Sequence, residues 1–444
     1  MSLQFITGGS GAGKSEYLSR LVCEESVRRP HDNFIVVVPE QYTMETQKKL
    51  VHMHSRKGIL NIDVVSFERL AYKVFEELGG GNRPVLDDTG KNLIVRRVLE
   101  KEKKKLDYFG SSIEKTGFVS ELKSVISELL QYGITPQQLG EIGENVKEKQ
   151  QLSAKLKDIR LVYKEFMAFL STNYITSEEI LDVLCGLVEK SKLIAGSEII
   201  FDGFTGFTPI QYKLMRLLLV YSKGIKISVT IDKKERPTGH ESWNNLFFMS
   251  KEMMNRLIAI CEEEGINVDD TVCVDRDINY RYEGAKDLAY LERNLFRYKG
   301  GVYTGTPENI RIYEGSNPKE ELQYIVSEIL QLTRKEGFRY RDIAVVTADL
   351  ETYGKVAANM MKQNDIPAFL DYKRSVAANP YVEMLCSALE IVEKGYPYDT
   401  MFRYLRTGLT GISRHDIDML ENYCLAVGIR GSRAWHEPWK KKMK

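Results

Sequence analysis

The sequence predicts an α/β protein with two domains built on parallel sheets, the first of them interrupted by an all-helical insertion. Three observations predict this class. A glycine-rich loop follows a short apolar strand close to the start of the chain. Apolar strands then alternate with amphipathic helical segments, which is typical of parallel strands joined by right-handed crossovers. Between residues 87 and 193 only helical periodicity remains, and strands return after it.

The glycine-rich loop matches the pattern G-x-x-x-x-G-K-[ST] without substitution. In such a loop the glycines let the backbone approach phosphate oxygens, the lysine reaches the β- and γ-phosphates, and the serine hydroxyl ligates Mg²⁺. The alternative is a chance glycine-rich turn, but an apolar strand precedes the loop and an amphipathic helix follows it. We therefore predict a site for ATP and Mg²⁺ formed by Gly8, Gly9, Ser10, Gly11, Ala12, Gly13, Lys14 and Ser15.

The first domain continues as strands and helices in alternation. Residues 33–39 are apolar almost throughout and end in proline, as expected for a strand that is buried on both faces. Further strands are expected at residues 61–67, 198–204 and 225–232. Helices are expected at residues 15–28, 40–52, 68–78 and 211–221. The domain therefore comprises residues 1–86 and 194–306.

Residues 87–193 are predicted to be a helical insertion in this domain. Apolar side chains recur at helical spacing there, for example at Phe118, Leu122, Val125 and Leu129. The lysine-rich run at residues 101–105 is expected to be a solvated helix face, with DNA contact as the alternative.

Asp202 is the acidic residue near the end of the strand expected at residues 198–204. A P-loop enzyme needs an acidic side chain at such a position to hold the water shell of Mg²⁺. We predict that Lys14 and Asp202 are catalytic and that Ser15 and Asp202 hold the metal. The alternative is an ordinary turn at the end of a strand. The next residue is Gly203, which has no side chain to orient an attacking water.

A second α/β domain is predicted after a connector that begins near Pro307. It would comprise residues 307–394, and residues 395–444 would begin a further helical insertion that looks truncated. Its strands are expected at residues 309–313, 343–347 and 367–371. Its helices are expected at residues 318–335, 353–365 and 380–393.

Composition excludes several classes of protein. The 444 residues are 43% hydrophobic and 28% charged, and the net charge of +1 excludes a polybasic nucleic-acid binder but not a local basic channel. The six cysteines contain no C-x-x-C pair, which favours a reducing compartment and argues against a zinc or iron–sulfur site within this segment. No signal peptide or membrane-spanning run is apparent, so we predict a cytoplasmic protein.

Four segments together resemble a known family. They are the P-loop, the Val-Pro-Glu-Gln run ending at Gln41, the Ser-Phe-Glu-Arg-Leu run from Ser66, and the Phe-Asp-Gly-Phe run from Phe201. They resemble superfamily 1 helicases of the UvrD type, and most of all the B subunits of bacterial AddAB helicase–nucleases. The resemblance extends over essentially the whole chain. It implies two RecA-like domains, with the second beginning around residues 340–367.

The resemblance also implies a function and partners. Such a subunit takes part in processing double-stranded DNA ends for homologous recombination repair, beside an AddA-type motor subunit. Single-stranded DNA is expected to cross the loops at Pro39, Gln41, Ser66 and Phe67. The full-length family members end in a nuclease domain with an iron–sulfur cluster. No such domain or cysteine spacing is present here, so the chain looks like an N-terminal fragment.

Two departures from the family bear on catalysis. Gly203 stands where active helicases place a glutamate, and Thr347 stands where they usually place an arginine. We therefore expect a degenerate helicase core that binds ATP and hydrolyses it slowly, so enzymatic activity of this fragment by itself stays open. The alternatives are a stand-alone P-loop ATPase or nucleotide kinase without a DNA role, and a scaffold with a vestigial loop.

Overall fold

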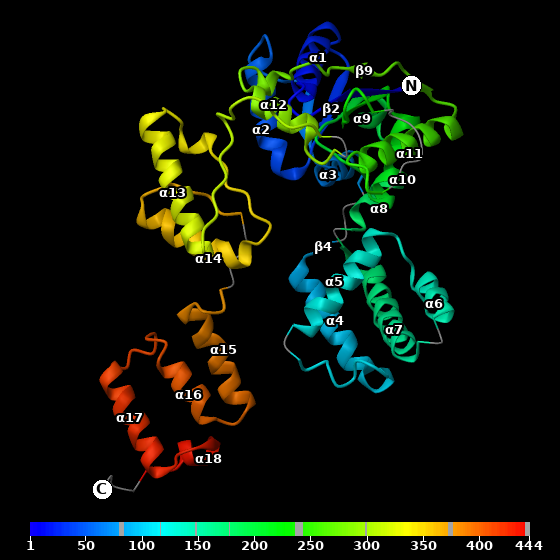
Figure 1. The fold of residues 1–444 in the computed structure, drawn as a ribbon. Helices are drawn as coiled ribbons and strands as arrows, with labels where there is room; N and C mark the ends of the chain where they lie inside the picture. The colour runs from blue at the N-terminus through cyan, green and yellow to red at the C-terminus, as the bar shows by residue number, and fades with distance from the viewer. Residues whose placement is uncertain are drawn as a thin grey trace. The chain divides into compact units, whose positions relative to one another are not determined.

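The computed structural model describes residues 1–79, 84–115, 117–146, 149–176, 178–235, 243–297, 300–371 and 376–439. The chain divides into two compact units, Met1–Arg311 and Ile312–Lys444 (Figure 1). The division follows shortly after the connector that the sequence places near Pro307.

A parallel sheet organises the described part of the first unit. Its seven strands run in the order β3-β2-β6-β7-β1-β8, and β9 also pairs with β1. Every pairing in the sheet is parallel, which confirms the predicted α/β class. The strands are β1 (Ser2–Gly8), β2 (Asn33–Val37), β3 (Ile62–Val65), β6 (Ser197–Phe201), β7 (Gly224–Thr230), β8 (Asn267–Val268) and β9 (Val272–Cys273).

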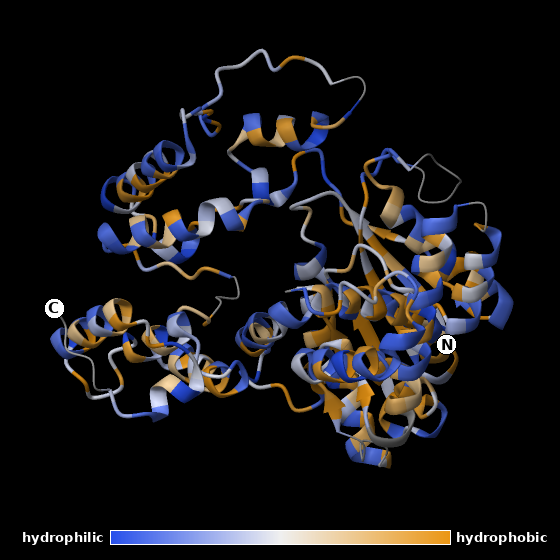
Figure 2. Cartoon of the chain, turned by 90° about the horizontal axis from the view of Figure 1, so that it is seen from below, coloured by the Kyte–Doolittle hydropathy of each residue, from blue (hydrophilic) through white to orange (hydrophobic). Residues whose placement is uncertain are grey.

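Helices cover the sheet on both faces because successive strand residues point to opposite sides. In β2, Ile35 and Val37 point into one core with α3, α10 and α11, whereas Phe34 and Val36 point into another core with α1 and α2. Figure 2 shows the strands as orange, hydrophobic arrows between helices of mixed colour. The helices that cover the two faces are α1 (Lys14–Arg28), α2 (Thr43–Met53), α3 (Phe67–Leu78), α10 (Pro209–Tyr221) and α11 (Phe248–Glu264).

The segment between β3 and β6 is largely helical, as predicted, and has its own core. Buried side chains of α4, α5, α6 and α7 form this core. A two-stranded parallel pair, β4 (Val85–Leu86) with β5 (Ile175–Thr176), was not anticipated. The α-helices are α4 (Asp88–Glu102), α5 (Phe118–Gln131), α6 (Pro136–Asn145), α7 (Gln150–Asn173), α8 (Ile180–Cys185) and α9 (Lys192–Ala195).

The lysine-rich run at residues 101–105 is engaged in ion pairs. Lys101 pairs with Glu165 at 2.9 Å, Lys103 with Glu114 at 3.0 Å, and Lys105 with Glu102 at 2.6 Å. These contacts favour the solvated helix face over the alternative of DNA contact.

The described part of the second unit contains helices and no paired strand. The predicted helices are confirmed at α13 (Pro318–Lys335), α14 (Leu350–Gln363) and α15 (Pro380–Glu393). They are followed by α16 (Tyr398–Leu405), α17 (Arg414–Val427) and α18 (Gly431–His436). Two small hydrophobic cores hold these helices, one between α13 and α14 and one among α16, α17 and α18.

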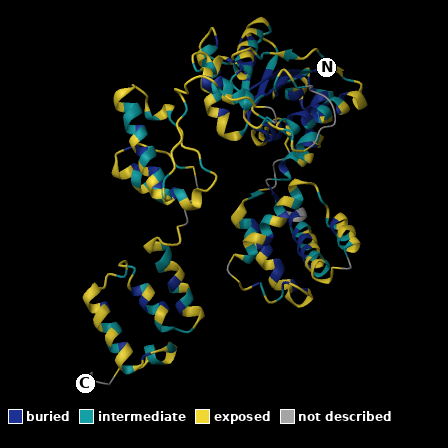
Figure 3. Ribbon diagram, viewed as in Figure 1, coloured by how far each residue is buried: buried dark blue, intermediate teal, exposed yellow. Residues whose placement is uncertain are grey.

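The three strands predicted in the second unit are therefore wrong as strands. Residues 309–313, 343–347 and 367–371 form no ladder with one another or with any other described residue. Ile312, Val346 and Phe369 are 95%, 91% and 91% exposed, and Figure 3 shows this unit mostly in the colours of partial or full exposure. A strand exists only when neighbouring strands accept and donate its backbone hydrogen bonds, and an apolar run does not supply those neighbours.

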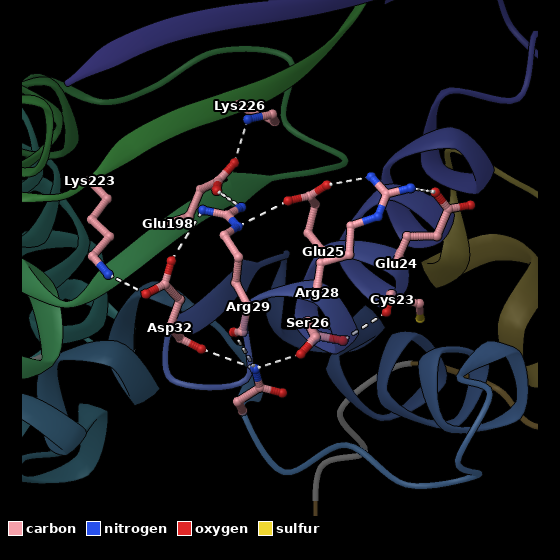
Figure 4. Close-up of polar contacts among 11 residues, drawn as sticks. Cys23, Glu24, Glu25, Ser26, Arg28, Arg29, Asp32, Glu198, Lys223 and Lys226 are labelled. Atoms are coloured by element: carbon pink, nitrogen blue, oxygen red, sulfur yellow. Dashed lines mark hydrogen bonds and ion pairs between the residues drawn. The ribbon is translucent and has the colours of Figure 1, made fainter.

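A network of ion pairs ties the end of α1 to the amino ends of β6 and β7 (Figure 4). Arg29 contacts Glu198 at 2.5 Å and Asp32 at 3.2 Å. Glu198 also pairs with Lys226, and Asp32 pairs with Lys223 at 2.5 Å. The network lies at the edge of the sheet opposite the glycine-rich loop, so it is a structural brace rather than part of the site.

Glu198→Ala is expected to lower the free energy of unfolding by about 2 kcal/mol, since Lys226 loses its carboxylate partner and Arg29 loses one of its partners. Glu24→Ala is the matched control, because Glu24 is exposed and its carboxylate, among the described residues, contacts Arg28 alone, at 3.9 Å. We expect that control to change stability by less than about 0.5 kcal/mol. Urea unfolding followed by circular dichroism measures both, and equal effects would contradict the role of the network.

The same network makes stability depend on pH. Burial alone would raise the pKa of Glu198, but its hydrogen bonds to Lys226 and Arg29 bring that pKa below its ordinary value. The bond from Lys223 likewise lowers the pKa of Asp32. A carboxyl group with a lowered folded-state pKa stabilises the fold above its unfolded pKa of about 4 and ceases to do so as the pH falls through the folded value. Acid unfolding of Glu198→Ala should therefore depend less steeply on pH than that of the natural protein.

Candidate nucleotide-binding site

The glycine-rich loop connects β1 to α1 at the carboxyl edge of the sheet. β1 ends at Gly8 and α1 begins at Lys14. Gly11 and Gly13 have φ angles of 72° and 93°, a left-handed conformation that favours glycine. At Gly11 an added Cβ would also lie 2.5 Å from the Cβ of Arg281, so both backbone shape and space require glycine there.

Lys14 curls back over this loop from the first turn of α1. Its Nζ donates to the carbonyl oxygens of Gly8 and Gly9, each at 2.9 Å. Burial lowers the pKa of the Lys14 ammonium, while the carboxylates of Asp202 and Asp275 act in the opposite direction. The ammonium is thus held at the loop by neutral acceptors, in a setting where an anionic partner would be favourable.

Asp202 follows β6 directly and lies at the same edge of the sheet. Its Oδ1 accepts a hydrogen bond of 2.5 Å from the hydroxyl of Ser228 in β7, which fixes the carboxylate. Gly203 has a φ of 84°, and its N–H donates to the Ser228 oxygen at 3.4 Å. The Asp202-Gly203 pair is therefore a strand-end turn whose acidic side chain is oriented by a neighbouring strand.

A cavity of about 400 Å³ brings the loop and the acidic turn together. Lys14, Ser15 and Asp202, which were predicted separately, all line it. Ser10, Gly11 and Gly13 also line it, whereas Gly8, Gly9 and Ala12 are not among the lining residues. The remaining lining residues are Glu16, Lys49, Gly203, Phe204, Thr205, Ser228, Thr230 and Arg281.

Arg281 is one of the cavity residues that the sequence analysis did not select. It belongs to a one-turn helix, η4 (Tyr280–Tyr282), and its backbone N–H donates to the Gly11 carbonyl at 3.3 Å. The ring of Tyr280 lies close to Gly13. A Cβ added at Gly13 would be only 3.3 Å from that ring. No periodicity or spacing marks this segment. Arg281 is 270 residues from Gly11, so the local sequence does not indicate that the two residues meet.

Ser15 and Asp202 are the protein residues that could contribute to holding Mg²⁺ at this cavity. Among the residues that the structure describes, no group of three or more His, Cys, Asp or Glu side chains is placed to hold a metal ion. Ser15 and Asp202 supply a hydroxyl and a carboxylate, which are oxygen ligands of the kind that Mg²⁺ prefers. The left-handed glycines, the lysine and the arginine fit the requirements of a nucleoside triphosphate.

The residues predicted to contact DNA do not lie together on the surface. Phe67 is 8% exposed and packs against Phe201, Phe204 and Phe207, with ring centroids 5.4–6.0 Å apart. The hydroxyl of Ser66 is buried and caps α3 by accepting from the Arg69 N–H. The burial of Phe67 favours a place in the hydrophobic core over a base-stacking role.

The other two predicted DNA contacts remain accessible. Pro39 is partly buried and Gln41 is exposed in a one-turn helix, η1 (Glu40–Tyr42), at the carboxyl end of β2. Tyr42, which the sequence analysis did not select, is 48% exposed beside them. Arg69 of α3 reaches this turn and pairs with Glu40 at 2.8 Å.

The fold and the cavity define a parallel α/β protein with a glycine-rich loop, a lysine and an oriented carboxylate at the carboxyl edge of its sheet. The chain belongs to the family described as ADDB, N-terminal, whose model matches residues 5–292. The match covers the loop, the sheet, the helical insertion and most of α12 (Lys286–Asn294).

Curated relatives match along the whole chain. The protein of Lachnoclostridium phytofermentans is 42% identical over 100% of this chain and 39% of its own length. Those of Caldanaerobacter subterraneus subsp. tengcongensis and Clostridium novyi are 37% and 34% identical over 99% of this chain and 38% of theirs. All three are named as the B subunit of an ATP-dependent helicase/deoxyribonuclease. The chain spans less than two fifths of the length of these relatives.

The helices contain no candidate for a membrane span. Within the described ranges, none is both long enough and apolar enough to cross a bilayer.

Proposed function

We propose that this chain is the ATP-binding and DNA-binding part of a subunit in a helicase–nuclease complex. The complex would process double-stranded DNA ends for homologous recombination repair. One observation carries the proposal: Lys14, Ser15 and Asp202 line a single cavity in a chain whose whole length matches helicase/deoxyribonuclease B subunits. A RecA-like first domain, an AddA-type partner subunit and a cytoplasmic location belong to the same proposal.

Different residues of the cavity would bind different parts of a nucleoside triphosphate and its Mg²⁺. Lys14, Arg281 and Lys49 supply positive charge, and the positive end of the α1 dipole adds to it. Ser15 and Asp202 would hold Mg²⁺, which neutralises part of the phosphate charge when it is bound. Ser228 keeps the carboxylate of Asp202 oriented through the hydrogen bond described above.

The helicase core would be degenerate because Gly203, the residue after Asp202, carries no carboxylate. Glu16 also lines the cavity, but its carboxylate pairs with Lys49 at 3.0 Å. Gly203 cannot accept a proton from water, and Thr347 lies in an exposed segment of the second unit. The nuclease activity and iron–sulfur cluster of longer family members would lie outside this chain.

Single-stranded DNA would cross the carboxyl edge of the sheet at the η1 turn. Exposed aromatic rings next to cationic side chains are typical of surfaces on which bases stack. Tyr42 supplies such a ring, and Arg69 supplies a guanidinium in the adjacent helix. Tyr42 therefore replaces Phe67 as the stacking candidate.

Tyr42→Ala should weaken binding of labelled single-stranded DNA by about 1–3 kcal/mol and leave thermal stability nearly unchanged. Phe67→Ala should instead destabilise the fold by about 3–5 kcal/mol, because a core aromatic ring is lost. Titrations at several salt concentrations measure the affinity, and phosphate contacts give a steep dependence on salt. An affinity for single-stranded DNA that changes neither with salt concentration nor in Tyr42→Ala would contradict a DNA role at this surface.

The alternative function is a stand-alone P-loop ATPase or nucleotide kinase without a DNA role. The second unit gives no argument against this alternative, because the strands expected there are unpaired among the described residues. The match with helicase/deoxyribonuclease B subunits along the whole chain now favours the DNA-processing function. Tight ATP binding with no DNA binding at low salt would favour the alternative.

A further inference from the structure

Helix α12 connects the glycine-rich loop to the connector that leads into the second unit. It holds the loop through Glu292 in its last turn and the connector through Asp287 in its first turn. The two residues are five positions apart, which corresponds to about 7.5 Å along a helix axis. One short helix therefore contacts both the loop that would bind nucleotide and the segment where the first unit ends.

The contact at the loop is close and leaves no spare room. The backbone N–H of Ser10 donates to Glu292 Oε1 at 3.2 Å, and the side-chain amide of Asn279 donates to the Ser10 carbonyl at 3.3 Å. A Cβ added at Gly9 would lie 3.0 Å from the same Glu292 oxygen. A shift of the loop at Ser10 must therefore displace Glu292 or break its hydrogen bond.

The contact at the connector is made by a buried carboxylate. Asp287 is 4% exposed, and its Oδ2 accepts from the backbone N–H groups of Glu308 and Asn309 at 2.9 and 2.7 Å. Its Oδ1 accepts from the Asn309 side chain at 2.9 Å. The hydrogen bonds from Asn309 hold the pKa of Asp287 below its ordinary value, so this carboxylate is ionised at neutral pH.

We propose that α12 couples nucleotide binding at the loop to the order of the connector at residues 308–309. Glu292 and Asp287 are then positioning residues, because neither lines the cavity that would hold the nucleotide. A triphosphate that fixes the loop also fixes Ser10 and Glu292, and a stiff helix transfers that restraint to Asp287. The inference rests on the proposed nucleotide site and adds a route by which ATP would act on the segment between the two units.

The amide protons in these contacts report on the coupling directly. Hydrogen exchange is measured on the whole chain with and without ATP and Mg²⁺, both at the loop and at Glu308 and Asn309. We expect ATP to slow exchange at the connector amides roughly fivefold, the lower end of typical coupling between sites. Protection of the loop without protection of the connector would overturn the coupling alone. No protection at either place would overturn the nucleotide site and the coupling with it.

Variants of Glu292 separate coupling from simple stabilisation. Glu292→Ala should abolish the effect of ATP on the connector, whereas Glu292→Gln, which keeps an acceptor oxygen, should retain most of it. Glu283→Ala is the matched control, since Glu283 precedes the same helix and its carboxylate pairs with Arg276 at 3.6 Å. An effect of ATP on the connector that survives Glu292→Ala would overturn the route through α12.

Coupling between two sites is reciprocal, which gives a second test at the other end of the helix. Asp287→Asn lies outside the cavity and should nevertheless weaken ATP binding by the same factor, roughly fivefold. Asp287→Ala serves the same purpose should the asparagine variant keep the connector in place. Unchanged ATP affinity in both variants, with the connector amides shown to be released, would overturn the proposal.

Discussion

Lys14→Ala is expected to remove nearly all ATP binding. The Lys14 ammonium is half-buried at the glycine-rich loop and is the charged donor that faces the cavity from α1. Losing the charged hydrogen-bonding partner of a bound anion costs about 2–5 kcal/mol, which raises Kd by a factor of roughly 30 to several thousand. Equilibrium dialysis with labelled ATP and Mg²⁺ measures the change.

Lys48→Ala provides the control for that experiment. Lys48 neighbours the cavity residue Lys49 on α2, but it does not line the cavity. The control should bind ATP as the natural protein does. Equal ATP affinity in Lys14→Ala and the natural protein would show that the nucleotide lies elsewhere.

Slow hydrolysis of bound ATP is the second large expected effect. Losing the general base of an enzyme typically reduces its rate by about 10²–10⁴. From a typical kcat of about 10 per second, we expect turnover of roughly 0.1 per second or less. Because Arg281 lines the cavity, we attribute the slow hydrolysis of ATP to Gly203 and not to a lack of arginine.

Phosphate release by the purified chain, with and without single-stranded DNA, tests this expectation. Turnover of several per second that disappears in Lys14→Ala would show that this chain is a motor by itself. Single-stranded DNA should increase turnover only weakly, because DNA supplies no base in place of the missing carboxylate.

Gly203→Glu should fail to restore hydrolysis, for a reason that the backbone provides. Gly203 has a φ of 84°, and a side chain in that conformation costs about 1–3 kcal/mol. The variant should therefore be less stable than the natural protein. Gly206→Glu is the matched control, because Gly206 is outside the left-handed region and the nearest atom to its added Cβ is 3.6 Å away. Full activity in Gly203→Glu would contradict the strain argument.

Local chemistry was readable directly from the sequence. The glycine-rich loop, the apolar strands of the first unit and most helix bounds depend on residues that are close together along the chain. Helix α13 spans Pro318–Lys335 as predicted, since its proline at the start and its apolar periodicity are local signals. The Asp202-Gly203 turn was found for the same reason.

Tertiary structure decided what depends on distant partners. Phe67 follows a strand in a pattern shared with DNA-contacting loops, yet three phenylalanines from residues 201–207 bury its ring. Arg281 and Glu292 meet the loop across about 270 and 282 residues of sequence, so no local pattern could place them there. In the part of the chain that the structure describes, the apolar runs of the second unit remain unpaired, because a ladder requires backbone partners that a run of side chains cannot specify.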